Sequence, residues 1–240
     1  MQTTHSKSHF SICVHPVGIL LTLVTILCLL IVSCGSDSST ESNQPAAAID
    51  VDGNVYKTVK IGDQIWMAEN LKVTHYRSGE PIPHPSASSW DLLTTGAYGN
   101  YGNDTALGEY FGRIYNGYAL TDARGVAPQG WHIPSLQEWQ ELIDFLGGDS
   151  VAGGKLKETG TEHWTSPNAG ATNASGFTAL PGGAWVQVPD RNIGFSGNFW
   201  TSTRGTGDSA WGFRVVYSDS AAHFEVCVKK GGMSIRCVKD

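Results

Sequence analysis

The sequence predicts an α+β fold made mostly of antiparallel strands and long loops, with one clear helix at about 135–146 and one short helix. Three observations predict this class. Several short segments alternate apolar and polar residues between glycine-rich turns, one segment has strong helical spacing, and many strand-like segments follow that helix. The 29 glycines among 240 residues, with only 16% charged residues, are typical of a loop-rich extracytoplasmic domain.

The folded domain is expected to begin with a β-hairpin. Residues 51–61 alternate apolar and polar side chains, Gly62-Asp63 forms a turn, and residues 64–68 continue in extended form. Residues 77–108 are rich in Pro, Ser, Gly and Asn, which predicts a long irregular region, and a strand is expected at 113–120. A long loop of this kind often carries function.

The clearest element is a helix that begins after Pro134. Ser135 is the expected N-cap, and Glu138 completes a capping box three residues later. Apolar side chains recur on one face at helical spacing, at Leu136, Trp139, Ile143 and Leu146. Gly147-Gly148 ends this helix, and a shorter helix is expected at 151–158. Further strands are expected at 176–180, 199–203 and 210–217.

Residues 1–33 are predicted to be a bacterial lipoprotein signal peptide. The apolar run 17–33 stops at Cys34, and Ile31-Val-Ser-Cys34 fits the pattern that precedes a lipid-modified cysteine. We expect cleavage before an acylated Cys34, a flexible linker over 34–48, and one folded domain over 49–240. The alternative is a single transmembrane anchor, because the run approaches the roughly 20 residues of a spanning helix.

These features predict a protein attached to the membrane through its N-terminal lipid, at the bacterial outer membrane or cell surface. Gly35, and not Asp, follows Cys34, so an inner-membrane retention signal of the enterobacterial kind is not evident. The segment before the apolar run has Lys7 as its only Lys or Arg, which leaves a start codon further downstream as an alternative. The formal net charge of -6 disfavours nucleic acid as a partner.

The cysteines favour one disulfide. With the signal removed and Cys34 acylated, Cys227 and Cys237 are the remaining thiols in an oxidising compartment. Residues 224–238 resemble two strands around a glycine turn, and a three-residue loop centred on Gly232 places the two cysteines opposite each other. A two-residue loop shifts the register and weakens the pairing.

Six phrases stand in order along the domain and carry a family resemblance. They are Ile61-Gly-Asp-Gln-Ile-Trp-Met-Ala-Glu-Asn-Leu71, Gly130-Trp-His-Ile-Pro-Ser135 with Glu138-Trp139, Gly153-Gly-Lys-Leu-Lys157, Gly176-Phe-Thr-Ala-Leu-Pro-Gly-Gly183, Phe199-Trp-Thr-Ser-Thr203 and Ser234-Ile-Arg-Cys-Val238. Together they resemble the Fibrobacter succinogenes major paralogous domain family over about residues 51–240. Its domains often occur on secreted and lipid-anchored bacterial proteins, so the resemblance implies the same location here.

A second resemblance concerns the fold. Ile133-Pro-Ser-Leu-Gln-Glu-Trp139 is similar to the helix start of formylglycine-generating enzymes, whose fold is C-type-lectin-like. That resemblance implies that the hairpin at 51–68 meets the end of the chain near 234–238. The chain departs from the family at Gly99 and Gly117, where members often carry Cys and Trp. The loss of a cysteine at 99 implies that Cys237 has changed its partner to Cys227.

No catalytic constellation is evident, and we expect a domain that is not an enzyme. Five histidines in the domain lack zinc spacing, and His132 is expected to be structural. Cys227 and Cys237 do not match the closely spaced cysteine pair of copper-dependent formylglycine-generating enzymes. The alternative is an extracytoplasmic enzyme, either formylglycine-generating-enzyme-like or active on polysaccharides.

The long loop contains a candidate calcium site. The alternative is that these residues form a solvated Asn/Gly turn. Its oxygen ligands would be Asn100, Asn103, Asp104 and Glu109, and lectin-like domains often bind calcium in such loops. No other cofactor is expected.

Three tryptophans in Gly/Ser/Pro-rich loops, Trp90, Trp164 and Trp185, are the candidate ligand-binding residues. The flat indole ring stacks on sugar faces, so exposed loop tryptophans would suit a polysaccharide or a surface-protein partner. The sequence therefore predicts a lipid-anchored binding or adhesion domain for an extracellular glycan or protein. A structural subunit of a surface assembly is the remaining alternative.

Overall fold

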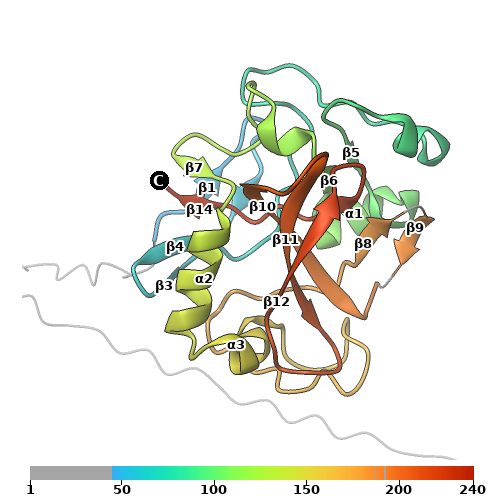
Figure 1. Ribbon diagram of the computed structural model, residues 1–240. Coiled ribbons are helices and arrows are strands. Elements are labelled where there is room, and N and C mark those ends of the chain that lie inside the picture. The colour runs from blue at the N-terminus through green and yellow to red at the C-terminus, as the bar shows by residue number, and fades with distance from the viewer. Residues whose placement is uncertain (1–44, 187, 192) are drawn as a thin grey trace, which may run out of the picture. The chain divides into compact units, whose positions relative to one another are not determined.

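A four-stranded antiparallel sheet joins the first and last parts of the domain in the computed structural model, which describes residues 45–186, 188–191 and 193–240. Its order is β3 (Thr58–Ile61), β4 (Gln64–Met67), β14 (Val238–Lys239) and β7 (Trp131–His132). Val238 lies opposite Trp66 on one side and opposite His132 on the other, and β14 lies between β4 and β7 in Figure 1. The predicted first hairpin forms over 58–67, shorter than the expected 51–68, and it meets the chain end at Val238 as expected.

A second sheet is a three-stranded meander of β10 (Ser196–Arg204), β11 (Ser209–Val216) and β12 (His223–Val228), with Phe213 between Phe199 and Phe224. A five-stranded sheet has the order β5 (Tyr98–Gly99), β6 (Ile114–Asn116), β13 (Gly232–Met233), β8 (Ala184–Val186) and β9 (Val188–Arg191). A small ribbon joins β1 (Ala48–Ile49) to β2 (Val55–Tyr56). Each of these strand pairs is antiparallel.

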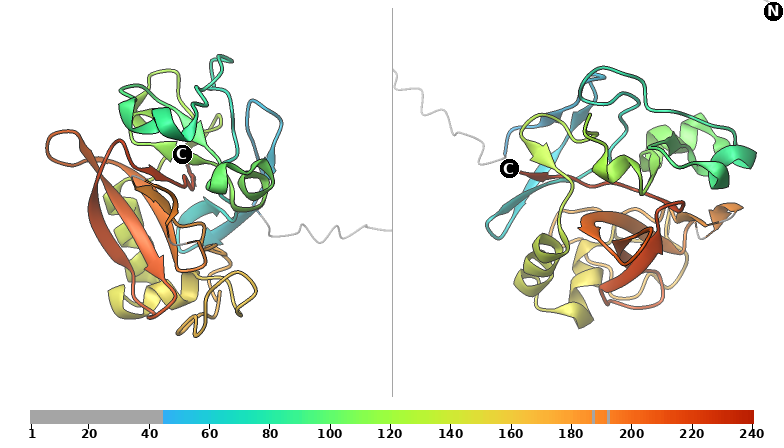
Figure 2. Two further views of the ribbon diagram at one scale, coloured as in Figure 1. Left: turned by 90° about the vertical axis from the view of Figure 1, so that its right-hand side faces the viewer. Right: turned by 45° about the horizontal axis from the view of Figure 1, so that its top comes forward.

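The helices are short. The predicted main helix is α2 (Leu136–Phe145), and the predicted short helix is α3 (Asp149–Leu156). Both pack against β11, on the side of the domain away from α1 (Thr105–Phe111), as the two views of Figure 2 show. The described residues also form three short segments of 3-10 helix, η1 (Ala87–Leu92), η2 (Tyr101–Asn103) and η3 (Ala119–Thr121).

Aromatic packing joins α2 to the sheets. Trp139 stacks on Phe213 of β11 at 4.2 Å between ring centroids and contacts Trp66 of β4 at 4.7 Å. Both indoles are fully buried. The apolar face that the helical spacing predicted is therefore the face that fills the core between α2 and the strands, except that Leu136 stays partly exposed.

The described residues have mostly antiparallel sheets and a few short helices, so the predicted class is confirmed at this level. Two local predictions differ. Helix α1 forms inside the segment expected to be irregular, because Asp104 caps it through its Oδ1, which accepts the Ala106 N–H at 2.8 Å. The segment 176–180 forms only an isolated bridge at Ala179 instead of a strand.

The predicted hairpin at the two cysteines is wrong. Cys227 lies in β12 opposite Ala210 of β11, whereas Cys237 precedes β14 and its carbonyl accepts the Met67 N–H at 3.0 Å. Gly232, which was expected at the centre of the turn, is the first residue of β13. The register argument for a disulfide therefore fails, and both thiols are free in the structure.

The predicted signal peptide, Cys34 and most of the predicted linker lie outside the described residues. Within those described, no helix has the length and apolar character that crossing a membrane requires.

Candidate functional site

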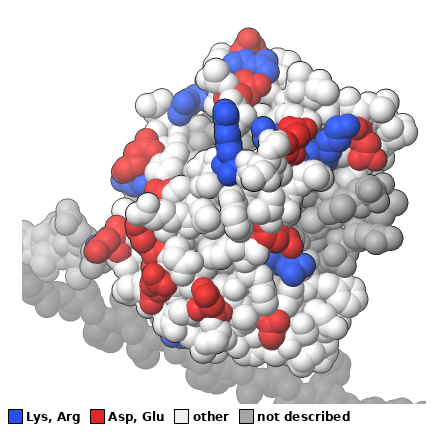
Figure 3. Space-filling model, in the orientation of Figure 1, with Lys and Arg blue, Asp and Glu red and all other residues white. Residues whose placement is uncertain are grey.

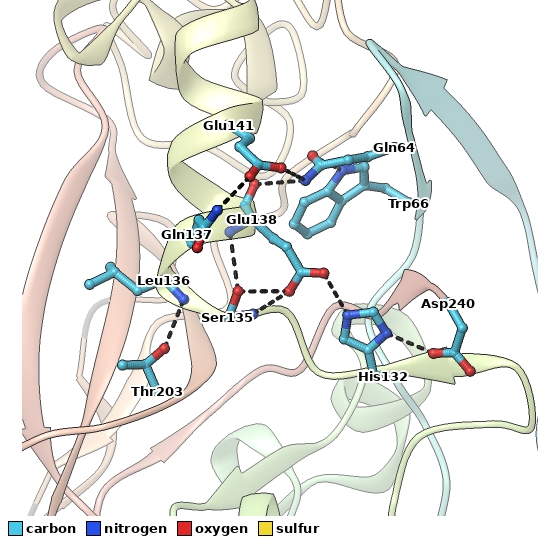
Figure 4. A network of polar contacts seen from close by, with 10 residues as sticks. All are labelled: Gln64, Trp66, His132, Ser135, Leu136, Gln137, Glu138, Glu141, Thr203 and Asp240. Carbon is cyan, nitrogen blue, oxygen red and sulfur yellow. Dashed lines mark hydrogen bonds and ion pairs between the residues drawn. The ribbon is translucent and has the colours of Figure 1, made fainter.

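The start of α2 carries a network of polar side chains, drawn in Figure 4. Ser135 caps the helix as predicted, with its Oγ accepting the Glu138 N–H at 3.2 Å while Glu138 Oε2 accepts the Ser135 N–H at 2.7 Å. The capping box is complete. Thr203 of β10 adds a further cap, because its Oγ1 accepts the Leu136 N–H at 2.9 Å.

His132 lies between two carboxylates at this helix start. Its Nε2 is 2.7 Å from Glu138 Oε1, and its Nδ1 is 2.7 Å from Asp240 Oδ1. Burial disfavours the imidazolium, but the hydrogen bonds to Asp240 and Glu138 outweigh burial and raise the pKa of His132. Both ring nitrogens are used within the protein, so His132 ties β7 to α2 and to the residue after β14, in agreement with the structural role expected.

A hollow of about 450 Å³ lies beside the same helix, and we call it the α2 hollow. Its wall consists of Ile61, Gly62, Asp63, Gln64, Glu141 and Phe145. The residues come from the turn between β3 and β4 and from the outer face of α2. Acidic side chains predominate over basic ones in the lower half of the surface in Figure 3, where these helices lie.

Hydrogen bonds fix the polar groups of the α2 hollow. The Gln64 amide donates from Nε2 to Glu138 O at 3.1 Å and to Glu141 Oε2 at 3.2 Å, and its Oε1 accepts from Trp66 Nε1 at 3.0 Å. Gln137 Nε2 donates to the other Glu141 oxygen at 3.0 Å. Figure 4 shows Gln64 and Glu141 facing each other between β4 and α2. A carboxylate and an amide are thus held in position before any ligand arrives.

Phe145 supplies an aromatic surface at this hollow. It lies one helical turn after Glu141, on the same face of α2, and 65% of the residue is exposed. The ring lies against Gly62, where a Cβ atom would be only 3.1 Å from a ring carbon. Gly62 also adopts φ +62°, which glycine reaches without strain, so the turn fits closely under the ring. The site therefore pairs an exposed ring with oriented oxygens.

The comparisons with known proteins point to one family. Residues 59–239, from β3 to β14, match the family model of the Fibrobacter succinogenes major domain. The chain belongs to this family. No curated protein and no solved structure matches the chain. The family description names no ligand or reaction, so function has to be argued from the site itself.

The three tryptophans predicted to bind ligand are buried, so the expectation that they are exposed is wrong. Trp90, Trp164 and Trp185 are 1%, 1% and 4% exposed. Trp90 stacks on Trp185 at 4.6 Å, and Trp164 donates from Nε1 to Ala179 O at 3.1 Å. The Gly/Ser/Pro-rich loops fold back onto the core, so residence in a loop does not expose these rings.

Both departures from the family pattern serve close packing. A Cβ atom at Gly99 would lie 3.1 Å from the Trp90 ring. At Gly117 it would lie 2.6 Å from Lys229 Cα, and the Gly117 N–H donates to Lys229 O at 2.7 Å. Glycine at these two positions lets the loops approach, and a tryptophan at 117 would collide with the backbone of Lys229.

Three of the four predicted calcium ligands, Asn100, Asp104 and Glu109, have other partners. Asn100 Oδ1 accepts from Arg113 Nη1 at 2.6 Å, and the Glu109 carboxylate pairs with Arg113 Nη2. Asp104 caps α1. Within the described residues no cluster of three or more His, Cys, Asp or Glu side chains could hold a metal. Calcium binding by this loop stays a prediction, and it would require Asn100 and Glu109 to exchange Arg113 for the ion.

Sequence reasoning missed Phe145 and Gln64. The helical spacing contained a signal, because Phe145 falls four residues after Glu141 and off the apolar face that contains Trp139 and Ile143. A large apolar residue on the polar face of an amphipathic helix is a recognisable exception. Gln64 gave no comparable signal, because its partners on α2 are distant in sequence.

Proposed function

We propose that this protein is a non-catalytic recognition domain, tethered at the bacterial cell surface by lipid at Cys34, and that its α2 hollow binds an extracellular glycan. The observation that carries the proposal is the exposed Phe145 ring beside the fixed Gln64 and Glu141 side chains. An aromatic ring stacks on the apolar face of a sugar, and a neighbouring carboxylate accepts hydrogen bonds from its hydroxyls.

Pre-orientation favours binding at this hollow. Gln64 and Glu141 already hold one conformation through bonds to Trp66, Gln137 and the α2 backbone. Side chains that are fixed in the free protein lose little entropy when a ligand binds. The Glu141 carboxylate remains largely exposed, so its remaining lone pairs can accept from ligand hydroxyls.

We assign the domain a C-type-lectin-like fold. Support comes from the closure of the chain, because β14 inserts between β4 and β7 and so joins the ends of the domain as that fold requires. The lipid tether rests on the apolar run that ends in Ile31-Val-Ser-Cys34, followed by a polar linker. A tethered module of this fold suits recognition of polymers outside the cell.

The cysteines also favour binding over oxidase chemistry. Burial raises the pKa of Cys227 to about 12, and burial raises the pKa of Cys237 further still. A thiol with a raised pKa is a poor nucleophile and a poor metal ligand, because both roles need the thiolate. Cys227 lies in β12, whereas Cys237 precedes β14 of another sheet, and both are free thiols.

A glycan array with the Phe145→Ala variant tests the proposal. Wild-type protein should bind at least one glycan class, and removal of the ring should weaken the best interaction about tenfold, or ~1.4 kcal/mol, because the stacking surface is lost. Glu141→Gln should weaken it less, since the side chain keeps its shape and loses charge.

Phe195→Ala is the matched control for the array. Phe195 is 44% exposed and lines a different hollow, so its removal should leave glycan binding unchanged. Two results would contradict the proposal. One is folded wild-type protein that binds nothing on the array, and the other is a Phe145→Ala variant that binds as wild type does. Circular dichroism confirms that each variant is folded.

One observation favours a second function, assembly with another protein through β12. Within the described chain β12 is an edge strand, and Val226 and Val228 are 51% and 61% exposed on it. An extended segment of a partner could add to this edge. Sedimentation of wild type and a Val226→Lys variant separates the possibilities, since assembly through β12 predicts a larger species only in wild type.

A further inference from the structure

A second hollow lies beside Tyr110 of α1 and shares no wall residue with the α2 hollow. Its volume is about 280 Å³, near the lower end of ligand pockets, which run from roughly 300 to 1,000 Å³. We call it the Tyr110 hollow, and its wall consists of Lys57, Ala68, Glu69, Asn70, Lys72, Tyr110, Glu158, Thr178 and Leu180. A space of this size suits one sugar ring better than a long segment.

A chain of hydrogen bonds orients the Tyr110 hydroxyl. Its oxygen lies 2.5 Å from His163 Nε2, and His163 Nδ1 lies 2.8 Å from Glu158 Oε2. Because a carboxylate accepts, Nδ1 donates to Glu158, and Nε2 faces the Tyr110 hydroxyl. The phenol oxygen keeps at least one lone pair for a ligand, and 50% of Tyr110 is exposed to solvent. Tyr110 offers a ligand an aromatic face and a hydrogen-bond acceptor.

The ammonium groups of the Tyr110 hollow are free to bind. Neither Lys57 nor Lys72 has an ion-pair partner in the part of the chain that the structure describes. The carboxylates on the same wall are used, because Glu69 Oε2 accepts the Lys57 N–H at 2.8 Å and Glu158 accepts from His163. The hollow thus presents unused cationic donors and partly used acceptors.

Arg236 adds a buried positive charge behind this wall. It is 0% exposed and donates from Nε and Nη2 to Asn70 Oδ1 at 2.8 and 2.6 Å, and from Nη1 to Phe177 O at 2.5 Å. These acceptors are neutral, and no carboxylate pairs with Arg236 within the described chain. Burial lowers its pKa to about 9, so it remains charged at neutral pH. This charge would attract an anion near Asn70 and Thr178, although Glu69 on the same wall opposes it in part, because its carboxylate also interacts with Arg236.

We propose that the Tyr110 hollow binds a hexuronate residue of an acidic polysaccharide. The pyranose ring lies on Tyr110, the Tyr110 oxygen accepts from a sugar hydroxyl, and Lys57 and Lys72 bind the carboxylate. Charge-assisted bonds from ammonium to carboxylate are stronger than neutral ones, which gives selectivity for an acidic over a neutral sugar. This site is separate from the glycan site proposed at the α2 hollow and does not depend on it.

Isothermal titration of the full-length protein in detergent micelles with trigalacturonate tests this site. The matched ligand is the same trimer with its carboxyl groups reduced to alcohols, which should bind at least tenfold more weakly. The double variant Lys57→Met, Lys72→Met should raise the Kd for trigalacturonate about tenfold. Tyr110→Phe should raise it by about threefold, because it keeps the ring and loses the acceptor oxygen.

Two variants serve as controls. Lys60→Met removes an exposed lysine of β3 that is not part of the hollow, and Phe145→Ala alters only the α2 hollow, so both should keep the wild-type Kd. Three results would overturn the proposal: no heat of binding with trigalacturonate, equal affinity for the reduced trimer, or an unchanged Kd in the double lysine variant. Binding of a sulfated trimer in place of trigalacturonate would also overturn it.

Discussion

His132 shows how one residue couples the last strand to the main helix. Glu138 and Asp240 approach its two ring nitrogens from α2 and from the residue after β14. The pKa of His132 is raised in the folded protein, so folding favours the imidazolium. The resulting stabilisation is fully present below the ordinary pKa of 6.5 and is lost as the pH rises through the raised value.

The free energy of unfolding should therefore depend on pH through His132. Between about pH 5.5 and 8.5, urea unfolding should show wild type losing more stability with rising pH than His132→Asn does. Glu138 does not change the pH dependence of stability in this range. Its pKa is lowered from 4.5, so its contribution to stability is lost only in more acidic solution. Asp240→Asn removes one carboxylate, keeps the capping box, and should show a smaller pH dependence than wild type. Parallel curves for wild type and His132→Asn would contradict this role.

At the scale of elements, α2, β10 and β11 could be predicted from sequence, but the pairing of the strands around the two cysteines could not. The residues that form the N-cap, the capping box and the apolar face of α2 all lie within about a dozen neighbouring positions. By contrast, β13 pairs with β6, more than 100 residues earlier in the chain, while β12 pairs with the preceding strand β11 and not with the segment after it. Two short strands around glycines look like a hairpin in a single sequence, so the pairing of Cys227 with Cys237 was misjudged.

The capping box should contribute measurably to stability. Ser135→Ala removes the acceptor of the Glu138 N–H and should lower the free energy of unfolding by about 1 kcal/mol in urea titrations. Ser150→Ala is the matched control, because Ser150 is an exposed residue inside α3 where alanine is tolerated. Equal midpoints for the two variants would show that the cap adds nothing.

At the scale of the whole domain, the sequence allowed the family and the closure of the chain to be predicted, but not the site. The phrases around Trp66, Trp139 and Arg236 lie in the core, so they identify the family and hold the sheets together. The exposed residues of the two hollows come together only through tertiary structure. Loop composition suggested exposed tryptophans, but a chain with few charged residues buries its largest rings wherever the loops permit.

The α2 hollow is the centre of this account, and chemical-shift mapping tests it most directly. Isotope-labelled protein is titrated with the glycan that binds best on the array, and amide and side-chain signals are followed. The account predicts that the largest shifts fall on Gly62, Gln64, Glu141 and Phe145. Shifts centred elsewhere, with these four residues unmoved at saturation, would contradict it.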